Sequence, residues 1–256
     1  MQKSIVKMKT FKMIGIALMA VLMCVNFTAC SEDYPTGDSP TPKPTNEKKL
    51  VKVMQYIDNT RLGSTTEFKY NEQGYISEAI FSYNEGYGWK SSTYKCNWDF
   101  SNNSMTVLED GEEDIKYTFS NGKIISYTDL RWGEESTYYT YDKNGYIIGG
   151  KSKYNTTTYI WNNGKLLMDD RYIRYSQQTC KGYFPLLGEY TGLDDLYMVH
   201  PELCGAKMNY LPSTISYNNG TYYTLNYELD SEGYVISYSV SHSEGGFRYT
   251  YELGWE

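Results

Sequence analysis

The sequence predicts an all-β protein in which an antiparallel up-and-down meander of roughly 12–15 strands curls into a barrel-like or half-barrel sheet. Three observations predict this fold. The 256-residue chain contains 29 tyrosines and 22 glycines, and tyrosine favours strands whereas glycine favours turns. Apolar and polar residues alternate in several segments, as they do in strands with one buried face. Glycine-containing turn signals separate these segments.

The first element is a leader, residues 1–29, which has the composition of a signal peptide. Its start contains no acid and four lysines: Lys3, Lys7, Lys9 and Lys12. The uncharged apolar run that follows, residues 13–25, is shorter than the about 20 residues that a membrane-spanning helix needs. Translation can begin at Met1 or at Met8, because either start leaves a basic segment before the apolar run.

The leader ends in Phe27-Thr28-Ala29-Cys30, which resembles the lipobox of bacterial lipoproteins. The resemblance implies that Cys30 becomes the first residue of the mature chain and carries palmitate-type acyl chains. Several such chains together anchor a protein firmly to a membrane. Phe27 departs from the motif, in which leucine is usual, and cleavage without lipidation is the alternative.

The second element, residues 30–49, is predicted to be the lipidated cysteine followed by a linker rich in proline and threonine. Residues 31–49 contain four of the seven prolines and no aliphatic side chain, so this stretch favours an extended spacer over a packed structure. Ser31-Glu32-Asp33 resembles an export signal that sends Bacteroidota lipoproteins to the cell surface. A solvated acidic linker is the alternative, so we expect an outer-membrane lipoprotein on either the periplasmic or the cell-surface face.

The third element, residues 50–256, is predicted to be a single β-meander domain. Clear alternation covers 94–100, 115–119, 223–229, 234–240 and 247–253. In the fourth of these segments Tyr234, Ile236, Tyr238 and Val240 share the predicted apolar face. One apolar face and one polar face are typical of antiparallel sheets.

Turn signals with an apolar residue on each side connect the predicted strands. The flanking pairs are Tyr70/Ile76, Phe119/Ile124, Tyr141/Ile147, Trp161/Leu166 and Leu229/Val235. Asn-Gly and Asp-x-Asn-Gly sequences at these sites suit hairpin loops with a glycine in the left-handed region. The spacing between the glycines is irregular, which favours a meander over a strict solenoid.

One segment, residues 171–212, lacks clean alternation and is predicted to be an irregular or short-helical insertion. A short helix is expected within residues 192–203. Long irregular insertions either carry function or cover part of the sheet, and a cap over an open edge is the favoured interpretation here.

The chain resembles a Bacteroidota lipoprotein family known as a domain of unknown function with a porin-like β fold. The matching features are the Cys30 leader, the linker, the Tyr-Asp-x-x-Gly-like hairpins and a tail that runs from Pro185-Leu186-Leu187-Gly188 through Leu211-Pro212 to Asp230-Ser231-Glu232-Gly233-Tyr234. The hairpins also resemble the YD repeats of bacterial surface proteins. The resemblance implies a curled sheet or barrel and supplies no catalytic residue.

The composition also limits the chemistry. His200 and His242 are the only histidines and have no metal-ligand spacing, so we expect no metal, no cofactor and no enzyme activity. The net charge is −7 and becomes more negative when the lysine-rich leader is removed, which argues against nucleic acid as a partner. A glycan-processing hydrolase that uses scattered carboxylates is the alternative.

Two pairs of residues are candidate sites. Trp89 and Trp132 lie in predicted loops and are expected to stack against a ligand, although aromatic residues also build the cores of sheets. Cys180 and Cys204 flank the irregular segment and form a disulfide or two buried thiols, whereas Cys96 is predicted to be a buried free thiol. The predicted function is therefore a non-catalytic cell-envelope lipoprotein, tethered to the membrane, that binds a glycan or a protein or has a structural role.

Overall fold

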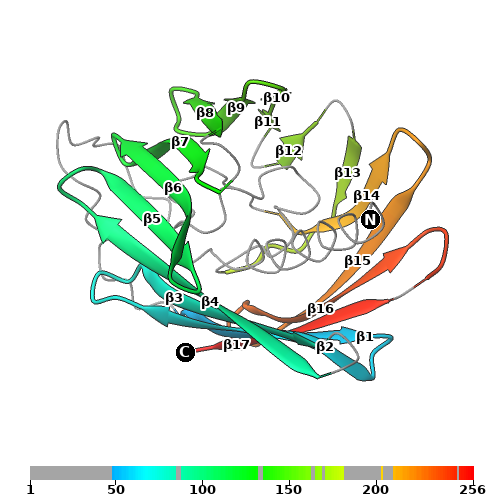
Figure 1. Cartoon of the computed structure of the whole chain (residues 1–256). Helices are drawn as coiled ribbons and strands as arrows, with labels where there is room; N and C mark the ends of the chain where they lie inside the picture. The colour runs from blue at the N-terminus through cyan, green and yellow to red at the C-terminus, as the bar shows by residue number, and fades with distance from the viewer. Residues whose placement is uncertain are drawn as a thin grey trace, which may run out of the picture.

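The computed structural model describes residues 48–84, 88–131, 135–162, 165–168, 171–181, 203, 210–246 and 248–256. These residues form one curved antiparallel sheet of 15 strands and a separate two-stranded hairpin. The strand order is β10-β9-β8-β7-β6-β5-β4-β3-β2-β1-β17-β16-β15-β14-β13. The predicted all-β meander is therefore confirmed, and its curvature is visible in Figure 1.

The strands of the large sheet are three to eleven residues long. In chain order they are β1 (Leu50–Ile57), β2 (Arg61–Tyr70), β3 (Ile76–Asn84), β4 (Trp89–Asp99), β5 (Ser104–Glu109), β6 (Glu112–Ser120), β7 (Lys123–Asp129), β8 (Glu135–Tyr141), β9 (Ile147–Lys151), β10 (Thr156–Thr158), β13 (Arg171–Tyr175), β14 (Pro212–Tyr217), β15 (Tyr222–Leu229), β16 (Val235–His242) and β17 (Tyr249–Trp255). The separate hairpin consists of β11 (Ile160–Asn162) and β12 (Lys165–Leu167).

The pairing of β1 with β17 joins the first and last strands of the chain. Val53 lies opposite Leu253, and Ile57 lies opposite Tyr249. Beyond these strands the backbone N–H of Glu256 donates to the carbonyl of Lys49 at 2.8 Å. The last strand therefore lies inside the sheet, with β1 on one side and β16 on the other (Figure 1).

The sheet is open, and β10 and β13 form its two edges. The β11–β12 hairpin is connected to the edge strand β13 and to β9, the neighbour of the other edge strand. The Tyr175 hydroxyl of β13 accepts from the Leu166 N–H at 2.9 Å and donates to the Leu166 carbonyl at 3.0 Å. On the other side, the indole N–H of Trp161 donates to the carbonyl of Ile147 at 2.6 Å. The architecture is thus a half-barrel, within the range that the sequence predicts.

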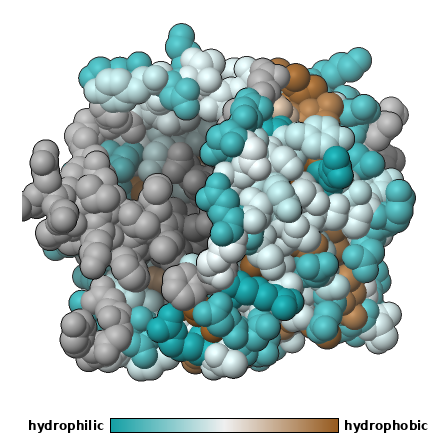
Figure 2. Space-filling model, turned by 90° about the vertical axis from the view of Figure 1, so that its right-hand side faces the viewer, coloured by the Kyte–Doolittle hydropathy of each residue, from teal (hydrophilic) through white to brown (hydrophobic). Residues whose placement is uncertain are grey.

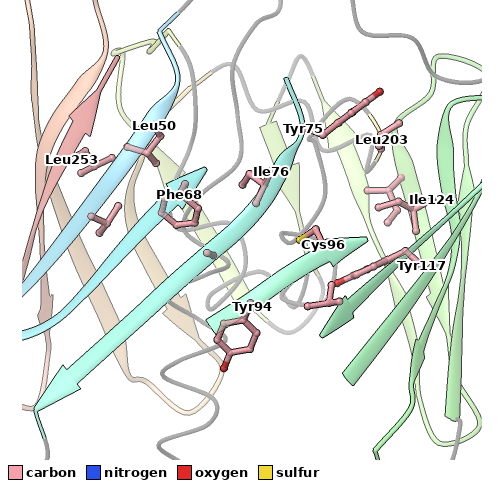
Figure 3. Close-up of a cluster of buried hydrophobic side chains, with 14 of the residues drawn as sticks. Leu50, Phe68, Tyr75, Ile76, Tyr94, Cys96, Tyr117, Ile124, Leu203 and Leu253 are labelled. Atoms are coloured by element: carbon pink, nitrogen blue, oxygen red, sulfur yellow. The ribbon is translucent and has the colours of Figure 1, made fainter. Parts of the chain in front are cut away.

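The hydrophobic core lies on the inner side of the curved sheet, as the labelled side chains of Figure 3 show. Tyr94 and Cys96 of β4 are buried, and so are Ile115 and Tyr117 of β6. Figure 2 shows the side formed by β13–β16, where hydrophilic and near-neutral residues predominate and apolar ones form small groups. For β4 and β6, the predicted alternation therefore identifies the inner face.

In β16 the predicted alternation is wrong at the start of the strand. Val235 is fully buried, whereas Ile236 is 40% exposed, although Tyr238 and Val240 are buried as expected. A β-bulge causes the difference: Glu228 of β15 pairs with Ser237, but the next residue, Leu229, pairs with Val235. The extra residue of a bulge reverses the in–out phase of the residues beyond it.

The irregular segment is shorter than predicted, because Arg171–Tyr175 forms β13 and Pro212 begins β14. Leu203 has helical backbone conformation and is buried in the core, whereas the rest of the expected helix, 192–202, lies outside the described residues. Within the described ranges, no helix is long and apolar enough to cross a membrane.

Candidate functional site

Successive hairpins of a meander turn at alternate ends of the sheet, so the turns form two sets, one at each end. We call the end with the β2–β3, β8–β9 and β15–β16 turns the entry end, since the described chain enters there. The ammonium of Lys48 lies 3.1 Å from Asp230 Oδ2 and 2.6 Å from Glu232 Oε1. The opposite end, with the β3–β4, β5–β6, β7–β8 and β9–β10 connections, is called the far end.

Three of the turns at the entry end share one backbone design. Each begins with Asn or Asp, whose Oδ1 accepts the backbone N–H four residues later at 2.9 Å, and each contains a glycine with positive φ. The three turns are Asn71 to Tyr75 with Gly74, Asp142 to Tyr146 with Gly145, and Asp230 to Tyr234 with Gly233. The side-chain acceptor satisfies a backbone donor that the tight turn removes from the ladder.

A tryptophan contacts each of these turns. The indole N–H groups donate to the carbonyl that follows the turn tyrosine: Trp98 to Ile76 at 2.8 Å, Trp161 to Ile147 at 2.6 Å and Trp255 to Val235 at 2.9 Å. Each indole also lies against that tyrosine, with centroids 4.4 Å apart for Tyr75/Trp98, 5.2 Å for Tyr146/Trp161 and 5.1 Å for Tyr234/Trp255. Sequence reasoning missed this role, although the repeated Gly-Tyr followed by Ile or Val is a signal for it.

Trp89, one of the two predicted stacking residues, lies at the far end. It begins β4, pairs with Asn84 of β3 and is 49% exposed. The pairing of β4 with β5 starts only at Tyr94, so the β3–β4 hairpin extends about 17 Å beyond that point, at ~3.3 Å per residue. Trp89 is therefore positioned for contact with a partner in solution.

Trp132, the second predicted stacking residue, lies outside the described residues, but Arg131 before it belongs to a charged cluster. Its Nε lies 3.0 Å from Asp114 Oδ1, and its Nη1 pairs with Glu109 Oε2. The Tyr94 hydroxyl donates to Glu109 Oε1 at 2.8 Å. Burial, with Glu109 nearby, raises the pKa of Tyr94 above its usual range. This phenol therefore stays protonated and remains a donor.

This cluster is suited to holding the β5–β6 and β7–β8 connections together. One guanidinium engages both carboxylates, and Arg131, Glu109 and Asp114 are each at least three-quarters buried. Partly buried charge-assisted hydrogen bonds of this kind fix geometry well. Glu109 and Asp114 thus hold Arg131 and, through it, stabilise the loops of the far end.

The cysteines and the histidine of the described region form no metal site. No group of three His, Cys, Asp or Glu side chains in the described ranges is placed to hold a metal ion. Cys96 is a buried free thiol, as predicted, and burial raises its pKa to about 12. Cys180 is half-buried, while Cys204 and Cys30 lie outside the described residues. The Cys180–Cys204 disulfide and the lipidation therefore stay predictions.

Comparisons with known proteins support the fold. No protein-family model matches the chain, and no curated protein matches it. Among solved structures, a porin-like protein from Bacteroides uniformis is similar with a TM-score of 0.58 and 14% identity, over 83% of this chain and 99% of that chain. A porin-like protein from Bacteroides vulgatus gives a TM-score of 0.28 at 11% identity, over 82% of this chain and 99% of that chain. The first similarity shows that the chain has a porin-like β fold.

Proposed function

We propose that the chain is a non-catalytic outer-membrane lipoprotein that binds a glycan with the far end of its half-barrel. One observation carries the proposal: the described chain enters the sheet at one end, whereas the exposed Trp89 lies at the other. A lipid on Cys30, followed by the proline-rich spacer, would then hold the entry end toward the membrane. The far end would point away from it.

The design of the two ends supports this division of roles. At the entry end the indole rings of Trp98, Trp161 and Trp255 are used in turn hydrogen bonds. At the far end Trp89 lies beyond the part of β4 that pairs with β5, next to the β3–β4 connection, and binding residues commonly lie at loops held by a rigid scaffold. An exposed indole at such a position suits stacking against the apolar face of a sugar ring.

A glycan array with the full-length chain tests the proposed binding. We expect binding to at least one glycan, and a loss of about tenfold or more in affinity for Trp89→Ala or Trp132→Ala. Ile236→Ala is the matched control, because Ile236 is exposed at the entry end. Absence of binding to every glycan would overturn the proposed ligand class, and turnover of a polysaccharide would overturn the non-catalytic assignment.

Cell fractionation tests the anchor. The wild-type chain is expected in the outer-membrane fraction with an acylated N-terminus, and Cys30→Ala is expected in the soluble fraction. The reason is that the apolar leader alone is too short to span a bilayer. A membrane-bound Cys30→Ala chain would contradict lipidation as the anchor.

A further inference from the structure

The outer face of β8, β9 and β10 carries a row of exposed side chains near the far end. Tyr138 lies opposite Lys151, and Lys151 lies opposite Thr156. Residues directly opposite each other in antiparallel strands have Cβ atoms about 5 Å apart. Tyr138 points outward, since Tyr139 next to it is buried in the core, and it is 62% exposed.

The β9–β10 turn continues this row with a second tyrosine. Ser152 and Asn155 close the turn, with the Ser152 N–H donating to the Asn155 carbonyl at 2.8 Å. Between them Tyr154 is 71% exposed, and the Lys153 ammonium lies 4.8 Å from the centre of its ring. Two exposed phenol rings and two lysines are thus gathered at one corner of the sheet.

Beside this row lies a low strip, a part of the outer face without a large side chain, because a glycine occupies its centre. Gly149 lies between Thr140 of β8 and Thr158 of β10. A Cβ at Gly149 would lie 2.8 Å from Thr140 Oγ1, so a larger residue fits at position 149 only if the Thr140 side chain moves. Threonines therefore flank a low strip, and the tyrosines lie beside it.

The charge of this segment is opposite to that of the whole chain. Residues 147–158 contain two lysines and no acid, whereas the chain has 31 acidic and 24 basic residues. Two lysines without an acid in this segment favour an anionic partner, because opposite charges attract.

We propose that Tyr138, Tyr154, Lys151 and Lys153 form a binding surface for an anionic polysaccharide. This inference rests on the proposed glycan-binding function and adds the charge class and the position of the ligand. The tyrosine rings supply stacking faces for sugar rings, and the lysines pair with carboxylate or sulfate groups. Two strand spacings, about 10 Å, separate the strands of Tyr138 and Thr156, so the surface is wide enough to contact more than one atom group of a sugar chain.

Isothermal titration of the full-length chain with polygalacturonate and with neutral dextran tests this proposal. Binding to polygalacturonate is expected to weaken with added salt, because salt screens exposed charges. Tyr138→Ala and Lys151→Glu are each expected to weaken it about tenfold or more. The matched controls are Tyr172→Ala and Lys116→Glu. They change an equally exposed tyrosine of β13 and an exposed lysine of β6 and are expected to leave binding unchanged.

The possible outcomes separate this inference from the proposed function. Binding of polygalacturonate that Tyr138→Ala and Lys151→Glu leave unchanged would overturn the anionic surface, while a glycan ligand at Trp89 would be retained. Equal loss with Lys116→Glu and Lys151→Glu would show general charge attraction and would also overturn the surface. Absence of binding to either polymer, together with a negative glycan array, would overturn both proposals.

Discussion

The indole N–H groups of Trp161 and Trp255 donate to backbone carbonyls that are shielded from water. Their acceptor residues Ile147 and Val235 have no exposed surface, and the ladder register shifts at both places. A buried carbonyl that loses its donor costs about 1–3 kcal/mol. The tryptophans therefore stabilise the turns through a specific hydrogen bond in addition to their buried area.

We expect Trp255→Phe to lower the free energy of unfolding by about 1–3 kcal/mol, because phenylalanine retains a ring against Tyr234 but has no donor for the Val235 carbonyl. Denaturant unfolding monitored by circular dichroism measures the change. Trp89→Phe is the control and should leave the midpoint unchanged, since the exposed Trp89 side chain makes no comparable contact in the described region. Equal midpoints for Trp255→Phe and wild type would contradict the structural role.

Asp230 is a turn residue with a predictable pH dependence. Backbone N–H donation from Tyr234, and the bond from Lys48, lower the pKa of the Asp230 carboxyl below its usual value. A carboxyl whose folded pKa is depressed stabilises the fold above its unfolded pKa of about 4, and that stabilisation is lost as the pH falls through the folded pKa.

Asp230→Asn should therefore keep the turn, because Asn71 performs the same backbone role in the first turn. We expect a small advantage of the wild type at neutral pH, which shrinks as the pH falls below about 4 and vanishes below the depressed folded pKa of Asp230. Urea midpoints over a pH series measure the difference. A stability advantage of the wild type that grows as the pH falls would contradict the expected pH dependence.

At the level of the elements, local pattern predicts faces well and long-range features poorly. Alternation identifies Tyr94 and Ile115 as inner residues, because the bulge of β6 lies before Ile115 and outside the alternating segment 115–119. It fails at Val235 and Ile236, since nothing in the local pattern marks the bulge that reverses their phase. The site shows the same limit: Trp89 is exposed as expected from its glycine-flanked position, whereas the surface that includes Tyr138 depends on cross-strand register.

One hydroxyl, that of Tyr175, makes two hydrogen bonds that link the β11–β12 hairpin to β13. Tyr175→Phe removes both hydrogen bonds to Leu166, so we expect faster exchange of the Leu166 amide hydrogen and a loss of about 1–3 kcal/mol in stability. Hydrogen exchange measured by NMR follows the amide. Tyr172→Phe, a change on the exposed face of the same strand, is the control. Unchanged Leu166 protection in Tyr175→Phe would show that other contacts hold the hairpin.

For the whole molecule, the position of β17 decides whether the sheet exists as one unit. β17 lies between β1 and β16, and Leu253 and Tyr251 are buried in its centre. The sequence does not predict this neighbourhood, because β1 and β17 are separated by nearly the full length of the domain.

Deletion of residues 249–256 is expected to abolish cooperative thermal unfolding, because the two arms of the sheet lose the strand that joins them. The single change Leu253→Ala is expected to cost about 2–5 kcal/mol. Circular dichroism and calorimetry measure both effects. A cooperative melt in the truncated chain would show that β1–β10 fold as a separate unit.

The same arrangement has a consequence for biogenesis. A ribosome delivers β17 after β1 to β16, so a growing chain that contains only these strands still lacks the strand that joins the two arms of its sheet. Until β17 emerges, the two arms of the sheet lack the strand that joins them, and an incompletely folded chain is suited to passage through a narrow secretion channel. If the leader directs export as predicted, this order of synthesis favours the start of passage before the sheet is complete.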